Sequence, residues 1–421
     1  MKSEKKIYKS DLISSTVRGG GKGPLIKRKE FLQVGSLATA SFMVPKFLKA
    51  FERVDRVPPG NKVTVILQLS GGNDGLNTVI PVRNDIYYRD RPRLGIQRAS
   101  SLTLTDEVAL HPALSALREL YNDGNLGILN NVGYPNPDRS HFRSMDIWQT
   151  GSESTEYITT GWLGRYLDAQ CHGCDKPTYA LEIDDVLSLA LKGENSKAIA
   201  MKDPKRLFGT SNENFFRDVL KDHKNDGEET VDYLYKTMSE TLSSANYIFQ
   251  QSKLHPSSTE YPKTQLGNGL KTIASLIFSD INTKVYYISL GSFDTHVNQQ
   301  MQQQRLFTEL SDAVRAFTTD LKRNNRFNDV LMFTFSEFGR RVSQNASGGT
   351  DHGTANNMFL IGGALKQKGI INPMPDLNDL DEGDLKYKID FKTVYATVLK
   401  NWLDADDTAI LGRRYDHLGF C

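Results

Sequence analysis

The sequence predicts an α/β protein with a mostly parallel central sheet flanked by helices. Three observations predict this fold. Short apolar runs, each typical of a buried strand, recur along the chain and stop abruptly at Gly-rich polar loops. Segments with apolar residues at helical spacing lie between these runs. The polar loops carry acidic and histidine side chains at the strand ends, where the ligands of such sheets bind.

Composition sets the class of protein. At 421 residues the chain is long enough for one large domain or two smaller ones. Hydrophobic residues make up 38% and charged residues 24%, which is ordinary for a globular protein. The 52 basic and 50 acidic residues leave a net charge of only +2, so no basic excess favours nucleic acid as a partner. We therefore expect a globular protein with no nucleic-acid partner.

Residues 1–50 resemble an export signal. The stretch Arg28-Lys29-Glu30-Phe31-Leu32 resembles the twin-arginine signal R-R-x-F-L, with lysine in place of the second arginine. The uncharged segment from Phe31 to Val44 is shorter than the roughly 18 residues that span a bilayer, but it suits a signal peptide. This predicts an exported bacterial protein, periplasmic or extracellular, with no stable membrane span after signal removal. The alternative is a core or amphipathic N-terminal helix.

The first predicted strand is Val63–Ser70, which follows a Pro58-Pro59-Gly60 break. Two glycines after it permit tight turning and close backbone approach, and Asp74 lies just past the strand end. The loop lacks the G-x-G-x-x-G spacing of a dinucleotide fingerprint, which argues against a nucleotide-dependent dehydrogenase.

A helix is expected over His111–Asn122, with Pro112 in its first turn, and a second strand over Leu126–Val132. A proline-rich loop then leads to a helix that ends near Trp148, with Ser140 near its N-terminus. Serine at such a position is most often an N-cap. Because free amides and the helix dipole stabilise anions there, it could also be a nucleophile in a phosphate- or sulfate-sized pocket.

The region from about 161 to 280 predicts a helical insertion or cap within a domain that covers residues 60–421. Cys171 and Cys174 have C-x-x-C spacing but no second pair, so a zinc site is not expected, and the histidine order excludes haem attachment. A local disulfide in an exported protein is the simpler interpretation. The charged segment Lys221–Glu229 predicts a loop between two helical segments.

The last third of the chain supplies the remaining strand ends. Lys284–Leu290 predicts a third strand, and Asp294 and His296 beyond it are two residues apart, so both side chains can face one centre. Helices are expected over about 300–324 and 390–403. Between them, Asp329–Gly362 holds two apolar runs expected as parallel strands, separated by a loop that carries Ser336, Glu337, Asp351 and His352.

Six ionisable side chains therefore follow different strand ends: Asp74, Asp294, His296, Glu337, Asp351 and His352. If they converged with nothing between them, the four carboxylates would repel and desolvate one another. One or two divalent cations would resolve this. Histidine with carboxylate suits zinc, manganese or iron, and a carboxylate-rich half also suits magnesium or calcium. Beside such a centre Ser140 could act as an alkoxide nucleophile.

Five motifs resemble those of domain-of-unknown-function family fifteen-oh-one: Gly71-Gly72-Asn73-Asp74-Gly75-Leu76-Asn77, Arg139-Ser140-His141-Phe142, Phe293-Asp294-Thr295-His296, Ser336-Glu337-Phe338-Gly339-Arg340 and Gly349-Thr350-Asp351-His352-Gly353. The resemblance spans roughly Val63 to the C-terminus. It implies an exported protein with a sulfatase-like fold of the alkaline phosphatase superfamily.

The superfamily resemblance also implies roles by position. Asp74 matches a first-strand metal ligand, and Ser140 lies near the Ser/Thr nucleophile, with His141 able to take part of that role. The resemblance assigns metal binding to Asp294, His296, Glu337 and His352. Phe338 departs from the pattern, because phosphatases place a metal-binding histidine there. One metal site is then weaker, filled by His141 or Asp351, or absent.

Two functions are expected from these residues. The first is an exported metal-dependent hydrolase that acts on phosphate, sulfate or related anionic esters of a small molecule or glycan. The second is a non-catalytic exported binding or assembly protein that retains a degenerate metal site. We favour the hydrolase, because a purely structural role gives no reason to gather ionisable groups at strand ends.

Overall fold

The computed structural model describes residues 61–170, 177–195, 198–213, 218 and 229–421. Three predictions fall outside these ranges: the export signal in residues 1–50, the disulfide between Cys171 and Cys174, and most of the charged loop at 221–229. Among the described helices, none combines the length and apolar character that crossing a membrane requires.

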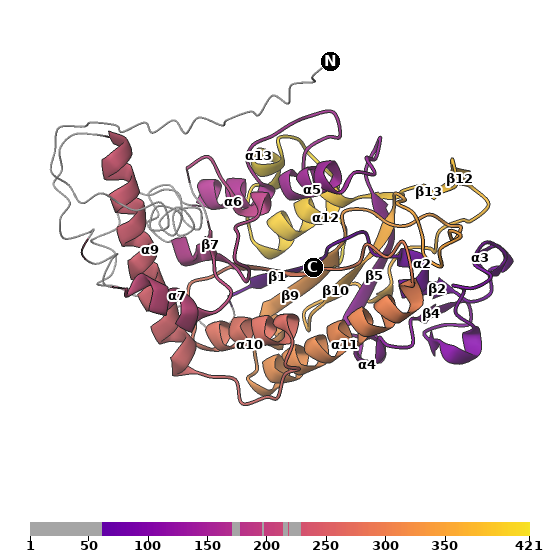
Figure 1. The fold of residues 1–421 in the computed structure, drawn as a ribbon, viewed down its shortest axis with the longest axis horizontal. Helices are drawn as coiled ribbons and strands as arrows, with labels where there is room; N and C mark the ends of the chain where they lie inside the picture. The colour runs from indigo at the N-terminus through magenta and orange to yellow at the C-terminus, as the bar shows by residue number, and fades with distance from the viewer. Residues whose placement is uncertain (1–60, 171–176, 196–197, 214–217, 219–228) are drawn as a thin grey trace, which may run out of the picture. The chain divides into compact units, whose positions relative to one another are not determined.

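A nine-stranded sheet forms the centre of the described domain (Figure 1). Its order is β11-β5-β10-β9-β1-β8-β6-β7, and β14 also pairs with β5. The strands are β1 Val63–Leu69, β5 Leu126–Gly133, β6 Ala180–Glu182, β7 Ile199–Ala200, β8 Val285–Leu290, β9 Val330–Phe335, β10 Asn356–Ile361, β11 Gly369–Ile370 and β14 Ile389–Asp390. All three strands predicted before residue 300 are present.

The sheet is mostly parallel, as predicted. The prediction of a parallel strand was wrong for β10, which runs antiparallel to both β5 and β9. A parallel return needs a crossover to the opposite sheet edge, usually through a helix. The segment between β9 and β10 contains no helix, so the chain enters β10 from the edge at which β9 ended. The loop before β10 therefore stays at the carboxyl edge of the parallel strands.

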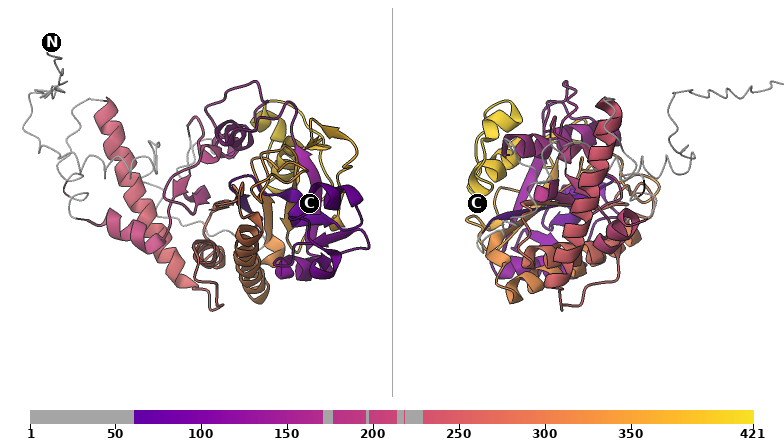
Figure 2. Two further views of the ribbon diagram at one scale, coloured as in Figure 1. Left: turned by 45° about the vertical axis from the view of Figure 1, so that its right-hand side comes forward. Right: turned by 90° about the vertical axis from the view of Figure 1, so that its left-hand side faces the viewer.

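Helices cover both faces of the sheet (Figures 1 and 2). Alternate residues of β1 enter two separate cores: Val65 and Leu67 face one core, and Ile66 faces the other. The first core contains the buried faces of α4 Ser115–Asn122, α10 Gln265–Phe278 and α11 Gln299–Arg323. The second contains those of α5 His141–Thr150, α6 Trp162–Gln170, α12 Phe391–Thr397 and α13 Asp407–Leu411. The continuously apolar strands are explained by this double coverage.

Smaller elements complete the fold. The helices are α2 Gly75–Thr78, α3 Asp85–Asp90, α7 Pro204–Ser211 and α9 Glu229–Leu254. A three-stranded sheet contains β2 Val79–Pro81, β3 Leu102–Thr103 and β4 Val108–Leu110, and β12 Leu380–Asp381 pairs with β13 Asp384–Leu385. Where the structure describes it, the region predicted as a helical insertion contains the α-helices α6, α7, α9 and α10, and it also supplies β6 and β7 to the main sheet.

The helix predicted from His111 begins four residues later, at Ser115, so its predicted start was wrong. Val108–Leu110 forms a strand that leads directly into His111. The Nδ1 atom of His111 accepts from the amide of Ala113 at 3.1 Å, and its carbonyl accepts from the amide of Leu114 at 2.9 Å. Because these local bonds fix a turn at residues 111–114, the helix cannot start there.

Candidate metal centre

The candidate site lies at the carboxyl edge of the parallel strands. Asp294 follows β8, Glu337 follows β9, and His352 precedes the antiparallel β10. His141 is the first residue of α5, which is reached from the end of β5. Segments far apart in the sequence thus deliver side chains to one place, as expected at the ligand-binding edge of a doubly wound sheet.

Two glycines allow the loops to approach closely. Gly71 and Gly72 follow β1 with φ of 118° and 75°, values that favour glycine. A Cβ on Gly71 would lie 2.4 Å from the amide nitrogen of Asp294, and one on Gly72 would lie 2.2 Å from the ring of Phe338. The Gly71 amide donates to Glu337 Oε1 at 2.8 Å, which ties the first loop to the end of β9.

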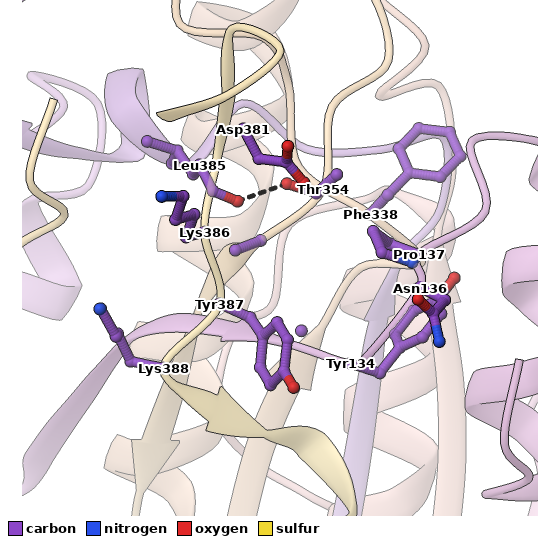
Figure 3. A pocket seen from close by; sticks show the side chains of 12 residues that line it. Tyr134, Asn136, Pro137, Phe338, Thr354, Asp381, Leu385, Lys386, Tyr387 and Lys388 are labelled. Atoms are coloured by element: carbon purple, nitrogen blue, oxygen red, sulfur yellow. Dashed lines mark hydrogen bonds between the residues drawn. The ribbon is translucent and has the colours of Figure 1, made fainter. Parts of the chain in front are cut away.

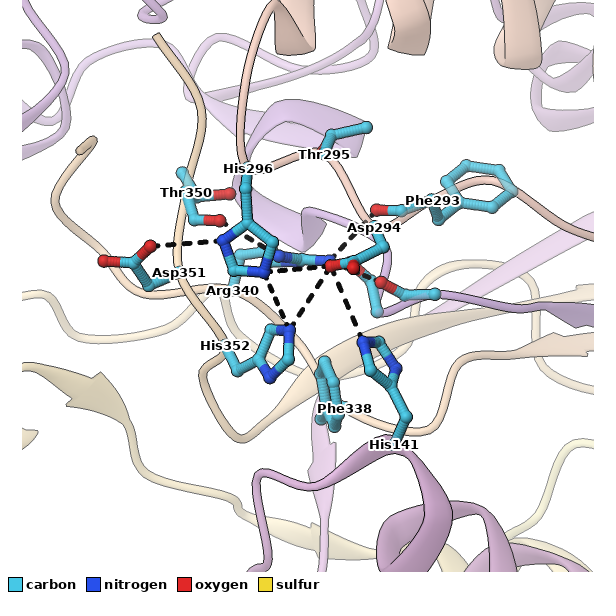
Figure 4. Close-up of polar contacts among 12 residues, drawn as sticks. His141, Phe293, Asp294, Thr295, His296, Phe338, Arg340, Thr350, Asp351 and His352 are labelled. Carbon is cyan, nitrogen blue, oxygen red and sulfur yellow. Dashed lines mark hydrogen bonds and ion pairs between the residues drawn. The ribbon is translucent and has the colours of Figure 1, made fainter. Parts of the chain in front are cut away.

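Three imidazoles surround one carboxylate oxygen (Figure 4). The Oδ1 atom of Asp294 lies 3.0 Å from His296 Nε2, 3.3 Å from His352 Nε2 and 3.6 Å from His141 Nε2. The Nε2 atoms of His296 and His352 are 3.0 Å apart. In a tetrahedral zinc site with bonds of about 2.0–2.1 Å, neighbouring ligand atoms lie roughly 3.3 Å apart. These four spacings are close to that value, whereas the group whose ligand atoms all lie within 4.8 Å of one another contains His141, Asp294 and His352 but not His296.

The opposite nitrogen of each ring has its own partner. His141 Nδ1 lies 2.9 Å from Glu337 Oε1, and His296 Nδ1 lies 3.2 Å from Asp351 Oδ1. His352 Nδ1 lies 2.8 Å from the carbonyl oxygen of Arg139. All three partners are acceptors, so they favour the tautomer with hydrogen on Nδ1 and a lone pair on Nε2. Metal-binding histidines are oriented in this way.

These contacts test whether the residues suit a cation. With hydrogen on each Nδ1, three Nε2 lone pairs converge on a carboxylate, and no proton separates His296 from His352. His141 Nε2 is buried and has no hydrogen-bond partner. The ligand atoms of His141, Asp294 and His352 all lie within 4.8 Å of one another. A divalent cation that prefers mixed nitrogen and oxygen ligands fits this arrangement.

The charges around the cluster favour the protonation states in which its carboxylates and imidazoles can bind a metal ion. Burial alone would raise the pKa of Asp294, but Arg340, His352 and His296 together lower it. The pKa of Asp351 is lowered mainly by its hydrogen bond from Asn345 and by His296. Burial lowers the pKa of His352, despite its bond to the Arg139 carbonyl. An ionised carboxylate and a neutral imidazole are the forms that bind metal.

Arg340 is a partner of the cluster that sequence reasoning did not assign. Its buried guanidinium lies 2.8 Å from Asp294 Oδ1 and donates to the carbonyl oxygens of Gly71, Gly72, Phe293 and Thr350. It therefore joins three loops beneath the imidazoles. The sequence did indicate such a role, because the guanidinium group of an arginine so close to a buried strand end needs several hydrogen-bond acceptors.

Asp74, a predicted metal ligand, makes its hydrogen bonds and its ion pair with groups other than the clustered histidines. Its carboxylate caps α2 and binds Arg91 Nη1 at 2.6 Å, with both side chains fully buried. Gln299 donates to the same carboxylate at 2.5 Å. The structure therefore brings together Asp294, His296, His352 and His141. Glu337 and Asp351 contact the outer side of the rings, and Asp74 is engaged elsewhere.

Ser140, the predicted nucleophile, occupies the N-cap position of α5. Its side chain makes no capping hydrogen bond and is exposed, and its amide donates to Asp138 Oδ1 at 2.6 Å. The next residue is His141. The Ser140 side chain is thus exposed next to His141 in the sequence, at the start of a ten-residue helix whose first amides have no acceptor within the helix.

Phe338 fills the position at which the superfamily resemblance expects a metal-binding histidine. Its ring is buried, and its centroid lies 4.8 Å from that of His141 and 4.5 Å from that of His352. The ring packs against two candidate ligands and offers none of its own. This contact favours one cation rather than two.

A buried acid contacts the two segments that lead to His141 and His352, and sequence reasoning also missed it. Asp384, at the start of β13, forms an ion pair with Arg139 and lies 3.5 Å from the Arg341 guanidinium. Its side chain is 1% exposed. Arg139 supplies the carbonyl that orients His352 and lies two residues before His141. Nothing in the short hairpin sequence indicated this role.

Comparison with known proteins gives a family. The sequence profile of a family described as a protein of unknown function (DUF1501) matches residues 123–411, which is more than half of the chain. All of the clustered ligands lie in this range, whereas Asp74 lies before it. No curated protein matches the chain significantly.

Three solved structures illustrate the similar folds. A sulfatase, PsFucS1, from Pseudoalteromonas sp. has 12% identity and a TM-score of 0.38, with 93% of this chain and 75% of that chain covered. An alkaline phosphatase superfamily protein from Vibrio parahaemolyticus has 10% identity and a TM-score of 0.34, covering 92% and 78%. The periplasmic domain of EcEptC from Escherichia coli, in complex with Zn, has 13% identity and a TM-score of 0.32, covering 73% and 78%. Similarities this weak assign no activity.

Proposed function

Since this chain belongs to the DUF1501 family, we propose that it is an exported hydrolase of phosphate, sulfate or related anionic esters that uses one divalent cation. His141, Asp294, His296 and His352 would hold the cation. The observation that carries the proposal is the convergence of three imidazole Nε2 atoms on Asp294 Oδ1, with an acceptor on every opposite ring nitrogen.

The bound cation would supply Lewis-acid stabilisation of the charge that develops on the ester oxygens. Ser140 is the proposed nucleophile, and the first amides of α5 would bind an ester oxygen. Glu337 and Asp351 would hold the rings of His141 and His296 in position, and Asp384 would do so for His352 through Arg139. The imidazoles would leave room for one substrate oxygen because the carboxylate side chain of Asp294 is 47% exposed.

A second candidate function is supported by the arginines. Arg91 already neutralises Asp74, and Arg340 already lies against Asp294. If these guanidinium groups supply all the positive charge that the carboxylates need, the site needs no metal. The protein is then a binding or assembly module. The hydrolase stays the better candidate, because Asp294 is the one ionisable side chain of the cluster to which Arg340 donates, and the lone pairs of three imidazoles stay unpaired.

The test is ester turnover by purified protein loaded in turn with zinc, manganese and iron. Aryl phosphate and aryl sulfate are suitable first substrates, with wild type compared to Ser140→Ala and His352→Ala. Turnover that is lost in both variants supports the proposal. No turnover on any ester, whether or not metal binds, would contradict the hydrolase, and failure to bind metal as well would favour the binding module.

Export is part of the proposal and is supported by the twin-arginine-like stretch around Arg28. Fractionation of expressing bacteria tests it, with Arg28→Ala and Lys29→Ala together as the variant. Loss of the protein from the periplasm in this variant is expected. Accumulation of wild type in the cytoplasm would contradict export.

A further inference from the structure

A pocket of about 350 Å³ lies beside the candidate metal centre (Figure 3). Its volume is within the range of pockets that bind small molecules. One part of its wall comes from the loop that leads to His141, and another from the residues that follow His352. The lining includes Tyr134, Asn136, Phe338, Asp381, Tyr387 and Lys388.

Phe338 joins the pocket to the centre. It lines the pocket and also packs on the rings of His141 and His352, with centroids 4.8 and 4.5 Å away. A histidine at this position would point a polar ring between the two sites. The phenylalanine ring is instead buried and packs on both histidines, so it forms an apolar wall that the pocket and the centre share.

The lining combines apolar surface with hydrogen-bonding groups. Tyr387 provides an exposed aromatic ring, the buried rings of Tyr134 and Phe338 form part of the wall, and Asn136 and Asp381 provide an exposed amide and an exposed carboxylate. Sugar rings have apolar C–H faces and hydroxyl groups around their edges, and tyrosine offers both an apolar face and a hydroxyl group. This combination suits a single pyranose ring better than a flat aromatic or an aliphatic chain.

The charge of the pocket mouth indicates an anionic sugar. Lys386 forms an ion pair with Asp379, which does not line the pocket, whereas no ion pair joins Lys388 to another described residue. Asp381 offsets part of this charge, and the cation at the centre would add to it. An anionic group on the bound ring would therefore be attracted toward the side of the pocket that Phe338 shares with the histidines.

We propose that this pocket binds the pyranose ring of a monosaccharide sulfate or phosphate, or of such a unit in a glycan, with the ester group on the side of the pocket that borders the metal centre. The inference rests on the proposed function for the ester-cleaving step. Binding of the ring itself requires only the pocket. The two claims can therefore be tested separately.

The test is saturation-transfer NMR and titration with a panel of 6-sulfates and 6-phosphates of glucose, galactose and mannose, and with the matching methyl glycosides. Wild type is compared with Tyr387→Ala and Asn136→Ala. Tyr157→Ala is the matched control, because Tyr157 is 81% exposed and lies outside the pocket. Asp294→Ala separates ring binding from cation binding.

We expect saturation of sugar ring protons, with Kd raised about tenfold by Tyr387→Ala, the loss of one aromatic contact of about 1.4 kcal/mol. The control should match wild type, and Asp294→Ala should still bind the methyl glycoside. If no ring proton is saturated, or if Tyr387→Ala and Asn136→Ala bind as wild type does, the pocket proposal is wrong while the metal centre stands. Ring binding without metal binding would overturn the proposed function alone.

Discussion

Asp74 and Asp294 both follow buried strands of one sheet, yet they have opposite environments. Asp74 follows β1, is fully buried and is neutralised by Arg91, with further bonds from Gln299 and the start of α2. Asp294 follows the adjacent β8, has a side chain that is 47% exposed, and faces three imidazoles. A carboxylate at a strand end is therefore a ligand candidate only when its neighbours leave it accessible and unsaturated.

The largest expected effect is on the stability of the protein, and it should differ between substitutions of Asp74 and of Asp294. Asp74→Asn should destabilise the protein by about 3–5 kcal/mol, because it leaves the Arg91 guanidinium buried without its counter-ion. Urea unfolding measures this loss. Asp294→Asn is the matched control and should lose far less, since the side chain is half exposed and Arg340 keeps four carbonyl partners. Equal losses would mean that both acids have a structural role.

For zinc affinity the order should be reversed, with a larger loss on substitution of Asp294 than of Asp74. Asp294→Ala should weaken zinc affinity at least about 100-fold, near 2.7 kcal/mol, because it removes the one carboxylate that all three imidazoles face. Asp74→Asn should leave zinc affinity within about threefold of wild type. Competition with a chromogenic chelator measures both. A metal defect in Asp74→Asn of the same size would show that the carboxylate near Arg91 is a ligand after all.

Substitution of an acid that contacts the Nδ1 atom of a ring should lower zinc affinity by a smaller factor. Asp351→Asn retains the shape of the side chain but removes the negative charge beside His296 Nδ1. We expect about a tenfold loss of zinc affinity, the lower end for changes to such outer partners. Chelator competition measures this loss. Asp312→Asn, an exposed acid on α11 that pairs with Arg315, is the control and should bind zinc as wild type does.

A third strand-end acid extends the comparison. Glu182, at the end of β6, is buried without an ion pair in the described chain, and burial raises its pKa to about 8. The folded state therefore holds a proton between about pH 4.5 and 8 that the unfolded state releases, so stability falls as pH rises through this window. The limiting slope is about 1.4 kcal/mol per pH unit.

Glu182→Gln should remove this component of the pH dependence while keeping the acceptor for the Ser188 amide. Urea unfolding of wild type and variant at pH 5, 6 and 7 measures the difference between their slopes. The variant should gain stability relative to wild type at each step. Parallel curves would mean that Glu182 is ionised in the fold at pH 5.

The fold could be predicted from the sequence because buried strands leave a strong local pattern. Val63–Leu69 and Val330–Phe335 are almost wholly apolar since helices cover both faces of the sheet. The direction of β10 could not be predicted, because strand direction depends on how the preceding loop returns to the sheet. That difference did not displace His352, whose loop remains at the carboxyl edge.

The site was predicted in part for a similar physical reason. Asp294 and His296 share a strand end, so their convergence follows from local geometry. The roles of Asp74 and Arg340 depend on contacts between residues far apart in the sequence. Arg91 is 17 residues from Asp74, and Arg340 is 46 residues from Asp294. Strand-end position indicates which acids can meet a cation but not whether an arginine already occupies that place.

The most direct test of the central claim is elemental analysis of wild type and Asp294→Ala, purified without added metal or chelator and then loaded with zinc. The structure predicts one equivalent in wild type, because Phe338 offers no ligand for a second ion, and much less than one in the variant. No zinc in wild type after loading would contradict a metal centre and favour the arginine-neutralised binding module. Two equivalents would contradict the single-cation assignment.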